Sequence, residues 1–123
     1  MTIAQFKRIT LALPEATESA HMGHSGFRVK GKVFASLGYP DAGHGMVKLA
    51  PGQQALFVDA EPAMFFPAKG AWGKQGATCI VLRAAKAKPL RAAKAKPLRA
   101  ALTAAWRNTA PKPLVRAFDE ETP

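Results

Sequence analysis

The spacing of apolar residues near the start of the chain is that of an amphipathic helix. Apolar side chains recur there at roughly helical intervals, at Ile3, Phe6, Ile9 and Leu13. Thr2 and Gln5 have the spacing of a capping box, in which a hydroxyl and an amide side chain satisfy the first free backbone amides of a helix. Pro14 ends the pattern. We therefore expect a helix over residues 2–13 and a loop over the polar residues 15–26.

From Phe27 onwards the hydrophobic period changes to two, which is typical of β-strands. Two strands are predicted, over residues 27–29 and 32–39. Lys30 and Gly31 between them are expected to form a tight turn, because glycine tolerates positive φ. Later apolar runs predict three more strands, over residues 46–50, 63–66 and 77–83.

Prolines and glycines divide the middle of the chain. Pro51 suits the first position of a helix, so residues 51–60 are predicted to be helical. Pro67 has no backbone N–H to donate, so the strand that precedes it is expected near a sheet edge. The glycine-rich residues 69–76 are predicted to form a loop that carries Trp72.

The C-terminal part of the chain is helical in character. Large apolar side chains recur four residues apart, with alanines between them, at Leu98, Leu102 and Trp106. This stripe predicts a helix over residues 97–107 that docks on the sheet. Pro111 and Pro113 then interrupt the chain. A last short helix is anchored by three apolar side chains, Leu114, Val115 and Phe118. Residues 119–123 are expected to form a solvated tail.

The predicted elements follow the order α-β(3)-α-β(2)-α, with a short terminal helix. This order fits an α+β fold in which an antiparallel sheet of about five strands has its helices packed on one side. A chain of 123 residues is long enough to bury a core. We therefore expect a single domain over residues 1–118.

A basic unit of eight residues occurs twice in succession, as Arg83–Leu90 and Arg91–Leu98. Eight residues advance about 80° beyond two full helical turns, so a continuous helix would not present both sets of cations on one face. Each copy also contains a proline, and we expect a short helical piece after Pro89, a break at Pro97 and the docked helix beyond it. We interpret residues 84–96 as a basic linker lengthened by a tolerated duplication. The alternative is a duplication retained for its charge.

The positive charge of the chain, net +10 at pH 7, is concentrated in the C-terminal half. Between Arg83 and Arg116 there are ten basic residues and no acidic residue. Such an asymmetry favours a polyanionic partner, most simply nucleic acid. A solvated face that binds nothing specific has the same composition, and both interpretations stay open at this point.

Residues that carry catalysis or bind metal ions are scarce in this sequence. His21 and His24 lie three residues apart, but neither has a Cys, Asp or Glu at a recognised ligand spacing, and with His44 they predict no metal site. Cys79 lies in an apolar strand, where a thiol is normally an inert core residue. No serine elbow, carboxylate pair or phosphate-binding glycine loop is recognisable. We therefore expect neither an enzyme nor a cofactor.

The sequence has no sign of a membrane or secreted protein. No apolar run reaches the roughly eighteen residues that a membrane helix requires. The first residues lack the layout of a secretory signal, and the single cysteine can form no internal disulfide. These features favour a cytoplasmic protein without a membrane partner.

Binding to nucleic acid requires cations for the phosphates and groups that reach the bases or stack on them. The predicted hairpin offers Arg28, Lys30 and Lys32, and the glycine-rich loop offers Trp72 and Lys74 for stacking and charge. The full candidate set is Arg28, Lys30, Lys32, Trp72, Lys74, Arg83, Lys86, Lys88, Arg91, Lys94, Lys96, Arg99 and Arg107. The alternatives are a solvated sheet face and, for Trp72, a ring packed over the core edge. The hypothesis requires that the hairpin and C-terminal cations share one surface.

Four segments carry a resemblance to a known family. They read "FKRITLALPEATE", "HMGHSGFRVKGKVFASLG", "GAWGKQGATCIVL" and "LRAALTAAWRNTAPKPLV". Together they cover nearly the whole chain, which resembles the MmcQ/YjbR family of small bacterial proteins. The second copy of "RAAKAKPL" departs from the family pattern, so the insert is a poor place to seek a shared function.

The resemblance implies a fold related to secretion chaperones and to the frataxin-like topology. Members of the family are described as double-wing DNA-binding proteins, by structural likeness to a phage transcription factor domain. The resemblance therefore implies duplex DNA as the partner, bound mainly through phosphate contacts. The chaperone-like fold implies an alternative, a protein- or peptide-binding module that uses a sheet face or edge. Met64, Phe65, Phe66 and Trp72 would supply its apolar patch.

Overall fold

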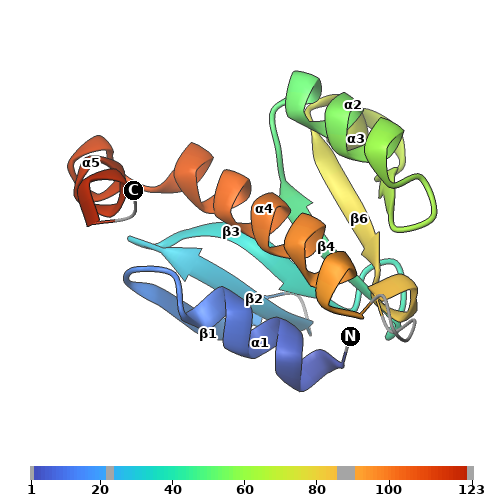
Figure 1. The fold of residues 1–123 in the computed structure, drawn as a ribbon, viewed down its shortest axis with the longest axis horizontal. Helices are drawn as coiled ribbons and strands as arrows, with labels where there is room; N and C mark the ends of the chain where they lie inside the picture. Colours follow the sequence, from blue (N-terminus) through green and yellow to red (C-terminus); the bar gives the residue numbers. More distant parts are fainter. Residues whose placement is uncertain (1, 22–23, 86–90, 122–123) are drawn as a thin grey trace.

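The computed structural model describes residues 2–21, 24–85 and 91–121 of the chain (Figure 1). The strands in this part of the chain are β1 (Ala16–His21), β2 (His24–Val29), β3 (Lys32–Leu37), β4 (His44–Lys48), β5 (Phe65–Pro67) and β6 (Ala77–Val81). Its helices are α1 (Ile3–Leu11), α2 (Pro51–Ala60), α3 (Gly70–Lys74), α4 (Arg91–Thr109) and α5 (Lys112–Glu121), with a 3₁₀ turn η1 (Leu82–Ala85).

The six strands of this described part form one antiparallel sheet in the order β1-β2-β3-β4-β6-β5. The predicted antiparallel α+β fold is therefore confirmed, with one strand more than expected. β5, which ends at Pro67, lies at one edge of the sheet, as the proline predicted. β1 lies at the other edge.

The loop expected over residues 15–26 is wrong, because these residues contain β1 and the beginning of β2. β1 pairs with β2 in antiparallel register, starting from Ala16 opposite Val29. Residues 17–20 of β1 are exposed, so no alternation of apolar and polar positions marks this edge strand in the sequence. Backbone pairing with the strand that follows it defines β1, and not the pattern of its side chains.

The tight turn predicted between β2 and β3 is confirmed. Lys30 has a φ of 50° and Gly31 a φ of 83°, so both residues adopt the left-handed conformation that a two-residue hairpin turn requires. The register of β2 against β3 shifts between Phe27 and Arg28. The hairpin therefore carries Arg28, Lys30 and Lys32 together beside its turn.

The main core lies between one face of the sheet and helices α1, α2 and α4 (Figure 1). Its largest fully buried side chains come from both layers and include Phe6, Phe27, Phe34, Phe65, Leu98, Leu102 and Trp106. Each buried side chain of this size stabilises the fold by roughly 1.5–3 kcal/mol relative to exposure. The helices are therefore packed on the sheet through the apolar stripes that the sequence predicted.

Helix α4 continues through Pro97, so the predicted break at this residue is wrong. A proline inside a helix removes one backbone hydrogen bond and crowds the preceding turn, at a cost of about 3 kcal/mol. The apolar stripe that starts at Leu98 is fully buried against the sheet, and its burial outweighs this cost. Within the expected linker over residues 84–96, residues 91–96 form the first turns of α4, and residues 86–90 lie outside the described part of the chain.

Two segments are more helical than the sequence predicted. Residues 70–74, expected in a loop, form the short helix α3. Helix α5 continues to Glu121, so three residues of the expected tail are helical. No helix in the part of the chain that the structure describes is long and apolar enough to cross a bilayer.

A second, smaller apolar cluster lies on the opposite face of the sheet. Met46 and Cys79 are register partners on β4 and β6, and with Ala68 and Ala77 they form its buried centre. Tyr39 and Phe66 pack against this centre from the outside. The thiol is therefore part of a core, as the sequence predicted.

We expect the Cys79 thiol to react very slowly in the native protein. Burial raises its pKa to about 11, so at about pH 8 the native protein holds roughly a hundredfold less thiolate than a chain with an ordinary thiol. Alkylation by iodoacetamide, followed by mass spectrometry with and without urea, measures the difference. Equal rates in both conditions would contradict the buried position of Cys79.

Candidate nucleic-acid interface

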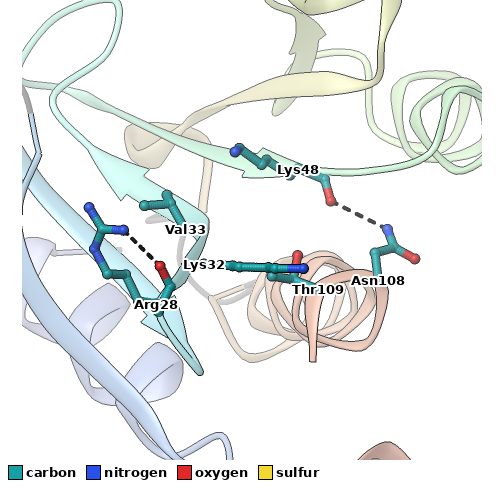
Figure 2. Close-up of a pocket in the computed structure, with 7 residues that line it drawn as sticks. Arg28, Lys32, Val33, Lys48, Asn108 and Thr109 are labelled. Atoms are coloured by element: carbon teal, nitrogen blue, oxygen red, sulfur yellow. Dashed lines mark hydrogen bonds between the residues drawn. The ribbon is translucent and has the colours of Figure 1, made fainter. Parts of the chain in front are cut away.

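A cavity opens where β3 and β4 stop pairing. The ladder between the two strands runs from Leu37 opposite Gly45 to Ala35 opposite Val47 and ends there. Beyond this point the hairpin turn, the end of β4 and the C-terminal end of α4 surround a cavity of about 460 Å³ (Figure 2). Its lining residues are Arg28, Gly31, Lys32, Val33, Lys48, Asn108 and Thr109.

The guanidinium of Arg28 is held in place by two hydrogen bonds. Its Nε donates to Ser19 Oγ at 3.0 Å, and its Nη1 donates to the carbonyl oxygen of Gly31 at 3.0 Å (Figure 2). The first bond reaches across to β1 and the second reaches the hairpin turn. Because a guanidinium has five N–H donors, a fixed cation with donors to spare lines the cavity.

Asn108 ties the far wall of the cavity to the sheet. Its Nδ2 donates to the carbonyl oxygen of Lys48 at 3.3 Å (Figure 2) and to Gln53 Oε1 at 2.7 Å. These bonds join the end of α4 to the end of β4 and to the first turn of α2. The wall is therefore set by three elements that are distant in sequence.

The cavity is electropositive. Arg28, Lys32 and Lys48 line it, and none of its lining residues is acidic. The C-terminal end of α4 contributes the negative end of a helix dipole, about half an elementary charge. Three full positive charges outweigh that dipole, so the cavity suits an anion.

Two other predicted cations are engaged by carboxylates. Lys30 pairs with Glu15 at 2.5 Å between Nζ and Oε1. Arg107 pairs with Asp119 of α5, and the hydrogen bond between them raises the pKa of Arg107. To contact nucleic acid, Lys30 and Arg107 would each have to give up this carboxylate partner for a phosphate.

Two described cations of the C-terminal half, Arg83 and Arg99, line other cavities than the hairpin cations do. Arg83 belongs to η1, which packs against α4, and Arg83 lines a separate cavity with Asp41 and His44. Arg99 lines a groove between α1 and α4, about 13 Å back along the helix from Asn108 at 1.5 Å per residue. The structure therefore does not bring Arg83 and Arg99 into one cavity with Arg28 and Lys32.

The remaining candidates have other positions. Lys96 is exposed on α4, and Lys74 is exposed at the end of α3. Arg91 and Lys94 lie on the first turns of α4, and only their backbone is described. Lys86 and Lys88 lie outside the described residues.

The sequence reasoning missed Lys48 and Asn108. Lys48 ends an apolar strand and Asn108 ends an alanine-rich helix, and each looked like an ordinary solvated position. The signal that was available is the single charge within the run "MVKLA". It became informative only once the fold placed it opposite the hairpin.

Trp72 lies beside a second, smaller cavity. This cavity of about 130 Å³ is lined by Lys48, Leu49, Trp72, Gln75 and Ala77. The ring of Trp72 packs edge-to-face on Tyr39, with centroids 5.2 Å apart, and 37% of the residue's surface is exposed. Trp72 is therefore a half-exposed ring adjacent to a cation.

Most of the side chains expected to form the apolar patch for peptide binding are buried in the core. Met64 and Phe65 are fully buried, and Phe66 is half-buried against the second cluster. The peptide-binding alternative therefore lacks the patch on which the sequence argument relied.

The histidines that were considered as ligands have ordinary roles where their side chains are described. His44 Nδ1 lies 2.7 Å from Asp41 Oδ1, and this hydrogen bond, together with one from the Gly43 N–H, lowers the pKa of Asp41. Within the described residues, no three His, Cys, Asp or Glu side chains lie together as a metal site requires.

Comparisons with known proteins agree with the resemblance found in the sequence. The YjbR family model matches residues 11–108. A solved structure, the crystal structure of Deinococcus radiodurans protein DR2400 with the domain DUF419, has a TM-score of 0.70 and 16% sequence identity. The match covers 98% of this chain and 86% of that one. An identity this low shows a shared fold alone. None of the curated proteins matches the sequence. The chain belongs to the YjbR family.

Proposed function

We propose that this protein is a non-enzymatic DNA-binding protein that contacts duplex DNA mainly through its phosphates. The observation that supports the proposal is the convergence of Arg28, Lys32 and Lys48 on one cavity without an acidic lining residue. The three cations come from three strands. Their convergence is therefore a property of the fold and not of a local run of basic residues.

The arginine and the two lysines of this cavity would contact phosphates in different ways. Arg28 is fixed by its bonds to Ser19 and Gly31, so it can present a rigid fork of donors to a phosphate oxygen. Lys32 and Lys48 are exposed and carry mobile point charges that can follow a backbone. Phosphate contacts of this kind position a duplex without reading its sequence.

Arg99 has a weaker role in this proposal. Electrostatic interactions between exposed charges fade over about 8 Å at physiological salt, which is less than the separation of about 13 Å along α4 between Arg99 and Asn108. Charges at that distance attract DNA from afar but do not share a phosphate with Lys32 and Lys48. We therefore assign the specific contacts to the cavity and not to Arg99.

A salt titration of binding to a random-sequence duplex tests this proposal. The wild-type affinity is expected to fall linearly with salt on logarithmic axes. Replacing both Lys32 and Lys48 by Gln removes two phosphate contacts, so the slope is expected to become shallower by about 1.8, or 0.9 for each contact. Fluorescence anisotropy of a labelled duplex at several salt concentrations measures both quantities.

The matched control is Lys96→Gln combined with Arg99→Gln, which removes the same charge from exposed positions on α4. Its slope is expected to stay within about half a contact of the wild-type slope. An equal change of the salt slope in both double variants would mean that DNA is attracted by the total charge of the protein. The assignment of the phosphate contacts to the cavity would then be wrong. No binding at low salt would overturn the proposal as a whole.

A further inference from the structure

Lys48 belongs to two neighbouring cavities. It lines the electropositive cavity together with Arg28 and Lys32, and it also lines the smaller cavity together with Trp72. In Figure 2 its side chain extends from β4 toward the side of the cavity that Val33 lines. One cation therefore connects a phosphate-binding cavity with an exposed aromatic ring.

We infer from this connection that the site binds an unpaired nucleotide of a single strand, with its phosphate at Arg28, Lys32 and Lys48 and its base against Trp72. The inference rests on the phosphate contacts of the proposed function, but it differs from that proposal in naming a single strand, and not a duplex, as the form of DNA that the site prefers. A base within a duplex is paired and stacked on both sides, so its face is not available to a protein ring. An aromatic platform beside a basic groove is the usual means of holding single strands.

The position of Trp72 is set by the backbone around it. Gln54 Nε2 donates to the carbonyl oxygens of Gly73 and Ala77, both at 3.0 Å, which ties α2 to α3 and β6. A side chain at Gly73 would start 1.7 Å from the carbonyl oxygen of Ala68, so this turn packs directly on neighbouring backbone. The ring is therefore presented by a firmly held segment, as a stacking platform needs.

The chemistry of the small cavity also suits a base. Its lining combines Leu49 and Ala77, which are almost fully buried, with the exposed ring of Trp72, and the amide of Gln75 can donate to and accept from the polar rim of a base. No lining residue of this cavity is acidic. A carboxylate that would repel the neighbouring phosphate is therefore absent from both cavities' linings.

Binding of a single-stranded oligothymidylate of about twelve nucleotides and of a duplex of the same length tests this inference. We expect the wild type to bind the single strand more tightly. Trp72→Ala is expected to weaken single-strand binding about tenfold and duplex binding less than about twofold, because only the unpaired base loses its stacking partner. Leu56→Ala is the matched control, since Leu56 is the most exposed large apolar residue on the described surface, at 71%.

The fluorescence of Trp72 supplies a second measurement that does not depend on the alanine variant. The chain has two tryptophans, and Trp106 is fully buried, so quenching by the oligothymidylate reports on Trp72. Quenching is expected with the single strand and not with the duplex. Trp72→Phe keeps a stacking ring, so it is expected to bind within about threefold of the wild type and to show no quenching.

The outcomes separate the two proposals. Equal wild-type affinity for both oligonucleotides, or an equal loss for both in Trp72→Ala, would overturn the inference and leave salt-dependent DNA binding intact. Absence of duplex binding at low salt would overturn the proposed function itself, and absence of binding to the single strand would overturn the inference. Displacement of the oligothymidylate by micromolar thymidine monophosphate would show that the site takes a free nucleotide, which would also overturn the assignment to a strand.

Discussion

Trp106→Ala lowers the free energy of unfolding by about 3–5 kcal/mol, which is the expected cost of truncating a buried tryptophan. Trp106 has no exposed surface. Its Nε1 donates to the carbonyl oxygen of Pro14 at 2.9 Å, and its ring lies 5.0 Å from that of Phe118. One side chain thus joins α4 to the end of α1 and to α5. Because domains of this size have a total stability of about 5–15 kcal/mol, the variant should be close to unfolding.

Urea denaturation followed by circular dichroism measures this loss. Trp106→Phe keeps an aromatic ring in the core but removes the hydrogen bond to Pro14 and the remaining atoms of the indole, so it is expected to cost about 1–3 kcal/mol. Leu56→Ala, at an exposed position, is expected to change stability by less than about 0.5 kcal/mol. If Trp106→Ala cost no more than Leu56→Ala, the docking of α4 described above would be wrong. A loss of this size would also weaken the proposed DNA binding, since Asn108 and Thr109 on the same helix line the electropositive cavity.

Gly76→Ala is expected to cost about 3 kcal/mol or more, for two reasons that add. Gly76 has a φ of +111°, which residues with a side chain adopt only at a cost of about 1–3 kcal/mol. An added Cβ would also lie 1.8 Å from the carbonyl oxygen of Leu49, and backbone cannot yield as a flexible side chain does. The contact lies between the turn after α3 and the end of β4. Its loss would move Trp72 away from Lys48 in any molecules that still fold.

Gly52→Ala is the control for this substitution. Gly52 lies in the first turn of α2, and an added Cβ there would meet nothing within 4 Å. Alanine favours a helix over glycine by about 1 kcal/mol, so this variant is expected to be as stable as the wild type or more so. Thermal unfolding of both variants side by side gives the comparison. Similar melting temperatures for the two variants would contradict the close backbone approach at Gly76.

Short-range features of the fold were readable from the sequence because they depend on neighbours along the chain. The capping box is present as predicted, with the Thr2 N–H donating to Gln5 Oε1 at 2.8 Å and the Gln5 N–H donating to Thr2 Oγ1 at 3.1 Å. The turn at Lys30 and Gly31 is likewise decided by which residues tolerate positive φ. In both places the decisive interaction spans no more than three residues.

Features that failed to show in the sequence depend on backbone pairing or on burial, and not on the local pattern of residue types. β1 has exposed side chains and exists because β2 offers it a backbone ladder. The helix through Pro97 persists because the residues after the proline are buried against the sheet, a gain that no local propensity contains. Residues 91–96 form the start of α4, in line with the helical piece expected after Pro89, and the helix continues through Pro97, where a break was expected.

The candidate site divides in the same way. Arg28, Lys32 and Trp72 were recognisable as candidates from their residue types and their positions beside turns. Packing decided the rest of the site. It brought Lys48 into the cavity, paired Lys30 with Glu15 and placed Arg99 in a different groove. The sequence by itself determined the α+β class, the apolar stripes and the excess of positive charge, because composition and periodicity are properties of the chain. Only the tertiary structure decided which charges meet, because charges from separate strands come together through long-range backbone pairing and burial.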